Sequence, residues 1–60
     1  MIYQVNDEFG TRIDAYLAKK DSSKSRGYFQ TAIEQEKVLV NGKKIKASYK
    51  VNENDVIEVS

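Results

Sequence analysis

The sequence V-L-V-N-G-K-K-I-K-A-S-Y, from Val38 to Tyr49, predicts a β-hairpin. Asn41-Gly42 separates two runs of alternating apolar residues, and a two-residue type I′ turn needs positive φ at both central positions, which Asn and Gly tolerate best. We expect the paired strands over 38–40 and 43–46. Five lysines and no acid lie between Lys37 and Lys50. The tip of this hairpin is therefore basic, and it presents a surface that a polyanion could bind.

The net charge of +1 conceals a segregation of charge along the chain. Residues 1–18 hold one cation against three acids, and residues 51–60 hold three acids and no cation. Residues 19–50, in contrast, hold nine cations against three acids. The position of the charge, and not its total, indicates a negatively charged partner for the middle of the chain.

The composition excludes several classes of protein and site. There is no cysteine and no histidine among the 60 residues, so the commonest metal ligands and the commonest general base are missing. We expect no catalytic residue, no metal, no cofactor and no small-molecule ligand within this chain. The longest apolar run is far shorter than a membrane span requires. Because the N-terminus also lacks the features of a signal peptide, we expect a cytoplasmic protein with no membrane contact.

Two helices are predicted before the hairpin. Thr11 is the expected N-cap of the first helix, with Asp14 three residues later as a variant capping box, and the helix extends to about Lys20. Ser25 is the expected N-cap of the second helix. Helical spacing predicts that each helix buries one apolar stripe, formed by Ile13, Tyr16 and Leu17 in the first and by Phe29, Ala32 and Ile33 in the second.

Short strands are predicted at both ends of the chain. One is indicated by Ile2, Tyr3 and Val5, and a closing strand covers 55–59. This order predicts an α+β fold in which two N-terminal helices pack on one face of a small antiparallel sheet containing the Asn-Gly hairpin. We interpret residues 1–60 as one domain, with an extension over 1–10 and a core over 11–60. The closing strand ends almost at the last residue, which suggests a piece of a longer chain.

Six motifs in this order resemble the S4 RNA-binding domain. They are R-I-D-A-Y-L-A at Arg12 to Ala18, S-R at Ser25-Arg26, Q-T-A-I at Gln30 to Ile33, V-L-V-N-G-K at Val38 to Lys43, S-Y-K-V at Ser48 to Val51 and D-V-I-E-V at Asp55 to Val59. Their spacing matches the family over residues 11–60. The strand-like segment and acidic D-E-F-G that precede Arg12 are most similar to the N-terminal S4 domain of large ribosomal-RNA pseudouridine synthases.

The resemblance implies an S4-like fold and a function in RNA modification. The start of the second helix and the hairpin would bind structured RNA, ribosomal in preference to transfer RNA, with Arg26 and Lys43 at the contact positions of the family. Gly27 stands where the family often has a second serine, so a backbone approach replaces a hydroxyl contact there. The parent protein would be a pseudouridine synthase, an isomerase whose catalytic aspartate lies in another domain.

The residues themselves support this surface but leave alternatives open. The positive charge of Arg26 is repelled by the positive end of the helix dipole, and a bound phosphate would explain why an arginine occupies this position. Arg12 is interpreted as structural, paired with an acid of the closing strand, with a contact to RNA as the alternative. Tyr28 and Tyr49 could stack on a base, although a core position is favoured for Tyr49. The candidate RNA-binding residues are Arg26, Lys43, Lys44, Lys46, Lys24, Lys50, Gly27 and Tyr49.

A different class of function fits the same charges. The chain could be a protein-interaction module that docks on a ribosomal protein or on its own parent domain, with the basic hairpin steering association. Lys44 and Lys46 would then only keep the surface soluble. We expect the domain to be monomeric in either case. Apolar residues would dominate an alanine scan of a protein interface, whereas cations would dominate that of an RNA interface.

Overall fold

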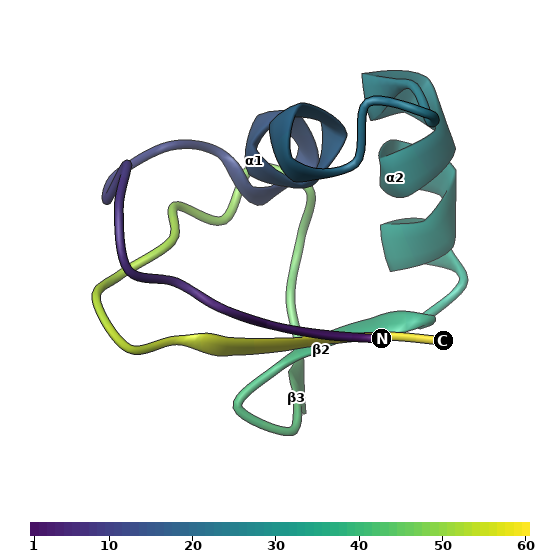
Figure 1. Ribbon diagram of the computed structural model, residues 1–60. Coiled ribbons are helices and arrows are strands. Elements are labelled where there is room, and N and C mark those ends of the chain that lie inside the picture. The colour runs from purple at the N-terminus through teal and green to yellow at the C-terminus, as the bar shows by residue number, and fades with distance from the viewer.

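Two helices cover one face of a four-stranded antiparallel sheet in the computed structural model, which describes all 60 residues (Figure 1). The strands lie in the order β1-β4-β2-β3, so the last strand separates the first from the hairpin. This confirms the predicted α+β fold. The elements are β1 (Ile2–Gln4), α1 (Ile13–Lys20), α2 (Arg26–Glu34), β2 (Val38–Val40), β3 (Lys43–Lys44) and β4 (Val56–Val59).

The hairpin turn has the predicted conformation. Asn41 has φ 53° and Gly42 has φ 78°, as a type I′ turn requires. The second strand is shorter than expected, because β3 contains only Lys43 and Lys44 and not residues 43–46. Ile45 leaves the strand pairing to pack against the hydrophobic core, and the chain then runs from the hairpin toward the start of α1 (Figure 1).

The predicted start of the second helix is correct, but that of the first is wrong. Ser25 caps α2 by accepting a 3.0 Å hydrogen bond from the backbone N–H of Tyr28. For α1 the N-cap is Arg12, and no side chain caps it. Thr11 lies one residue too early to be the cap, because the first helical hydrogen bond, from the Tyr16 N–H, goes to the Arg12 carbonyl at 2.9 Å. The Thr11 carbonyl accepts a bond from the Val51 N–H at 3.0 Å instead. The expected first and closing strands are present as β1 and β4.

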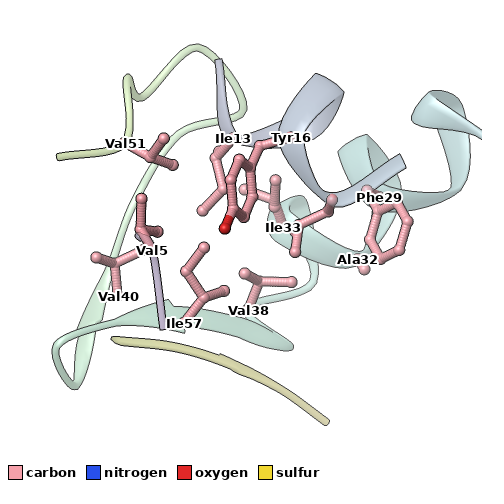
Figure 2. Close-up of a cluster of buried hydrophobic side chains, with 11 residues drawn as sticks. Val5, Ile13, Tyr16, Phe29, Ala32, Ile33, Val38, Val40, Val51 and Ile57 are labelled. Atoms are coloured by element: carbon pink, nitrogen blue, oxygen red, sulfur yellow. The ribbon is translucent and has the colours of Figure 1, made fainter. Parts of the chain in front are cut away.

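The hydrophobic core fills the space between the helices and the covered face of the sheet (Figure 2). Both predicted helix stripes are buried there, and Tyr16 is only 1% exposed. Neither helix reaches the length and apolar character needed to cross a bilayer. The core consists of Val5, Ile13, Tyr16, Leu17, Phe29, Ala32, Ile33, Val38, Val40, Val51 and Ile57.

Asp55 connects the hairpin turn to the loop that precedes β4. Its buried carboxylate accepts hydrogen bonds from the Asn41 side-chain amide at 3.0 Å, the Tyr49 hydroxyl at 2.6 Å and the Asn52 backbone N–H at 2.9 Å. Asn41 also accepts a 3.0 Å bond from the Val56 N–H through its amide oxygen. These contacts fix the hairpin relative to the middle of the sheet, so the position of its lysines depends on one carboxylate.

Candidate nucleic-acid interface

Arg26 is the first residue of α2, and its side chain is 49% exposed. A cation in the first turn is repelled by the helix dipole. The structure supplies a compensating charge, because the Arg26 Nε lies 3.2 Å from Asp14 Oδ2. The charge of Asp14 therefore explains why a cation is tolerated at the start of α2 without a bound ligand. The Arg26 side chain nevertheless stays half-exposed to solvent.

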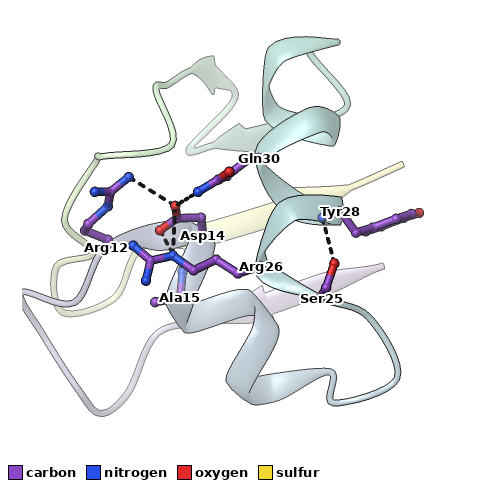
Figure 3. A network of polar contacts seen from close by, with 7 residues as sticks. All are labelled: Arg12, Asp14, Ala15, Ser25, Arg26, Tyr28 and Gln30. Atoms are coloured by element: carbon purple, nitrogen blue, oxygen red, sulfur yellow. Dashed lines mark hydrogen bonds and ion pairs between the residues drawn. The ribbon is translucent and has the colours of Figure 1, made fainter.

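Asp14 is the centre of a polar network at the junction of the two helices (Figure 3). Its Oδ2 also receives hydrogen bonds from Arg12 Nη2 at 3.1 Å and Gln30 Nε2 at 2.9 Å, and its Oδ1 accepts from the Ala15 N–H at 2.7 Å. Arg12 was expected to pair with an acid of the closing strand, and this expectation is wrong. Its partner is two residues away, because the helix turns Asp14 back toward the N-cap.

The Asp14 carboxylate remains charged despite complete burial of its side chain. Burial alone raises the pKa of a carboxyl group. Here the hydrogen bonds from Gln30, Ala15 and Arg26, together with the charge of Arg12, outweigh the burial and hold the pKa of Asp14 below its ordinary value. Asp14 therefore fixes two arginine side chains at neutral pH.

The two lysines of β3 start on opposite faces of the sheet. Lys43 pairs with Val40, which belongs to the core, so the Lys43 side chain starts on the face that the helices cover. Lys44 pairs with Leu39 and starts on the open face. It also forms an ion pair with Glu36 at 2.8 Å. The register therefore places Lys43, but not Lys44, on the face of the sheet that packs against the core.

The ion pairs divide the cations of the basic central segment into two groups. Lys19 pairs with Glu8, and Lys20 pairs with Asp7 at 3.1 Å, which joins the acidic N-terminal segment to α1. Lys44 is neutralised by Glu36. The lysines that make no ion pair and are exposed are Lys24, Lys37, Lys43, Lys46 and Lys50.

Lys46 and Lys50 follow the chain from the hairpin toward the helices. Both are exposed, and they lie in the segment that runs from β3 to the start of α1 (Figure 1). Lys50 is directly opposite Arg12 in an isolated antiparallel bridge. Opposite residues of such a bridge project to the same side. The bridge therefore brings Lys50 to the arginines of the Asp14 network.

The remaining candidates have different surroundings. The Lys24 Nζ lies 5.0 Å from the centre of the Tyr28 ring, close to the start of α2. Gly27 has open space around it, since an added Cβ would meet only Ser25 Oγ at 3.8 Å. Tyr49 packs against the core and donates its hydroxyl hydrogen bond to Asp55, which raises its pKa. Its ring is therefore held in place, whereas Tyr28 is 49% exposed.

Sequence reasoning missed Gln30 and the shared role of Arg12. Gln30 has no local signal of function, since it is 16 residues from Asp14 and meets it only when α1 and α2 pack. The R-I-D motif does place Arg12 near Asp14, but the motif does not reveal that Arg26 approaches the same oxygen. Only the packing of the two helices brings these side chains together.

The two buried aspartates predict acid sensitivity. Burial raises the pKa of Asp55 as well, but hydrogen bonds from Tyr49, Asn52 and Asn41 outweigh it, so both folded-state pKa values lie below the ordinary 3.8. Their stabilising effect is complete above the unfolded pKa and is lost as pH falls through the folded values. We expect urea midpoints to be constant down to about pH 5 and to fall steeply below about pH 4. A midpoint unchanged to about pH 3 would contradict this.

Comparison with known proteins identifies the fold family. The family model of the S4 domain matches residues 11–57. An uncharacterized RNA pseudouridine synthase from Chlorobaculum parvum is 43% identical over 49 residues, which cover 82% of this chain and 15% of that protein. Ribosomal large subunit pseudouridine synthase C from Rickettsia bellii is 37% identical over 57 residues, and its counterpart from Rickettsia typhi is 35% identical over 60.

The alignment with the Rickettsia bellii enzyme covers 95% of this chain and 19% of that enzyme. The alignment with the Rickettsia typhi enzyme covers 100% of this chain and 20% of that enzyme. The chain thus spans a fifth or less of the length of these relatives. No solved structure matches it. The family match extends from just before α1 through the first half of β4, and it includes every residue of the Asp14 network and the hairpin. The chain belongs to the S4 domain family.

Proposed function

We propose that this chain binds structured RNA through the start of α2 and the helix-facing side of the hairpin. The observation that carries this proposal is the distribution of unpaired cations. Lys19, Lys20 and Lys44 are neutralised by acids, whereas Lys43, Lys46 and Lys50 are not. Lys43, Lys46 and Lys50, three of the five unpaired lysines, follow the chain from the hairpin to the arginines at the helix junction, as an extended phosphate backbone would require.

Recognition on this surface rests on phosphates and shape. Lysine and arginine side chains contact phosphate oxygens without reading the base. Tyr49 is partly buried against the core, and its hydroxyl donates to Asp55, which favours a structural role over stacking. Tyr28 is the exposed aromatic residue closest to the start of α2, and it offers one position for an unpaired base. Such a surface suits a folded RNA that combines a helix with a loop.

The parent protein is proposed to be an RNA pseudouridine synthase. The names of the three relatives support this, and their greater length leaves room for a catalytic part outside this chain. Two of these names refer to the large ribosomal subunit, which favours ribosomal over transfer RNA and a cytoplasmic location. The chain would hold the substrate RNA and orient it for the active site of the parent enzyme.

Binding to RNA is expected to be strongly dependent on salt. If the surface contacts four to six phosphates, the slope of log affinity against log salt concentration should be roughly −3 to −5. Fluorescence anisotropy with a labelled stem-loop from large-subunit ribosomal RNA measures this slope. A DNA duplex of equal length is the control, and we expect weaker binding to it because its groove shape and sugar differ.

A slope near zero, or equal affinity for the RNA and the DNA, would overturn the proposal of a structured-RNA site. Capture of a protein partner that survives nuclease treatment would point instead to the protein-interaction module. In that case substitutions of exposed apolar residues such as Phe9, and not of lysines, would weaken binding.

A further inference from the structure

Two arginines share one buried carboxylate at the helix junction, although one cation would neutralise it. Arg12 and Arg26 approach the same oxygen of Asp14, at 3.1 and 3.2 Å. Gln30 and the Ala15 N–H supply two further donors, and no buried polar side-chain atom lacks a partner. The hydrogen-bonding needs of Asp14 are thus met with one positive charge in excess. A purely structural role does not require the second guanidinium.

Both guanidiniums keep most of their donors free. An arginine has five N–H groups in a planar fork, and each of these two directs one nitrogen at Asp14. The side chains are 44% and 49% exposed and make no other ion pair. Figure 3 shows Arg12 and Arg26 approaching Asp14 from α1 and α2, respectively. Their outward edges therefore present two sets of fixed donors next to each other.

We propose that Arg12 and Arg26 together hold one phosphodiester group, with Asp14 as their positioning residue. The inference rests on the RNA-binding function proposed above and adds Arg12 to its contacts. A phosphodiester has one negative charge and two terminal oxygens, which match the excess charge and the paired donors. Lys50, opposite Arg12 in the bridge, lies where the neighbouring phosphate would follow. Asp14 acts by restricting the rotation of both guanidiniums before the RNA arrives.

The Asp14→Asn variant separates positioning from simple attraction. Removal of this acid adds one positive charge, so general electrostatics predicts tighter binding. Loss of the positioning carboxylate predicts the opposite, and we expect about 5- to 10-fold weaker binding to the ribosomal stem-loop. Asp21→Asn is the matched control, because Asp21 lies before α2 and makes no contact with either arginine. The same change in charge there should leave affinity unchanged or slightly higher.

Substitution of Arg12, whose side chain is 44% exposed, covers the possibility that Asp14→Asn fails to fold. Arg12→Lys keeps the charge but loses the planar fork, and we expect about 10-fold weaker binding. Arg12→Gln should also reduce the salt slope by about one. Circular dichroism and urea unfolding establish that each variant is folded during the measurement.

The outcomes distinguish this inference from the function beneath it. Wild-type affinity in Arg12→Lys and Arg12→Gln, with salt-sensitive RNA binding by the wild type intact, would overturn the two-arginine site and leave the RNA-binding function standing. Weak binding of RNA by the wild type, with no dependence on salt concentration, would contradict the proposed RNA-binding function itself. Loss of affinity in the Arg12 variants with an unchanged urea midpoint would support the site.

Discussion

The Asp55→Ala variant is expected to be unfolded or nearly so at room temperature. Three hydrogen bonds reach this carboxylate, from Asn41, Tyr49 and Asn52, at 2.6 to 3.0 Å. Bonds to a charged group contribute about 1.5 kcal/mol or more each, so the loss of all three should lower the free energy of unfolding by about 4 to 5 kcal/mol. A 60-residue domain has only about 3 to 9 kcal/mol in total. Urea unfolding followed by far-UV circular dichroism measures the loss.

Asp55→Asn is the matched control for this prediction. It keeps the size of the side chain and one acceptor oxygen. Its amide nitrogen, however, is a donor and would face the donor groups that bind the Asp55 carboxylate. We expect an intermediate loss of about 2 kcal/mol. A loss below about 1 kcal/mol in Asp55→Ala would show that water replaces the carboxylate and that the hairpin is not fixed by it.

The sequence was sufficient for those parts of the fold that depend on neighbouring residues. Asn41-Gly42 determines its own backbone angles, and Ser25 caps α2 through a bond within one turn. The apolar stripes of the helices face the core because helical periodicity alone decides which residues share a face. For these features the local signal and the final contacts agree, so reading the chain in order gave the correct α+β fold.

Other features depend on contacts between distant residues, and the sequence did not reveal them. Thr11 has the right chemistry for a cap, but its carbonyl pairs with the Val51 N–H and the helix begins one residue later, at the Arg12 cap. Glu36 follows α2 with φ 61°, a conformation that usually requires glycine, and no local pattern indicates it. Lys43 and Lys44 were both candidate contacts, and the register of β2 and β3 shows that their side chains start on opposite faces of the sheet. The convergence on Asp14 likewise exists only once α1 and α2 pack.

The largest expected effect on RNA binding follows from combining one residue from each half of the surface. Arg26 is the first residue of α2, and Lys43 lies on β3 with its side chain starting on the face that the helices cover. Each charge-assisted phosphate contact contributes about 1.5 kcal/mol or more. The Arg26→Gln, Lys43→Gln double variant should therefore bind the ribosomal stem-loop about 100-fold more weakly. Its salt slope should be shallower by about two, since two phosphate contacts are lost.

A second double variant, Lys19→Gln, Lys44→Gln, removes the same total charge from two lysines that pair with Glu8 and Glu36 and lie outside the proposed surface. If attraction to RNA depended only on net charge, the two double variants would bind alike. If position decides, as the division of the cations indicates, the control should lose less than about 3-fold. Anisotropy titrations of both variants at two salt concentrations compare them directly. Equal losses would contradict the interface, because they would assign the binding to diffuse charge and not to the start of α2 and the hairpin.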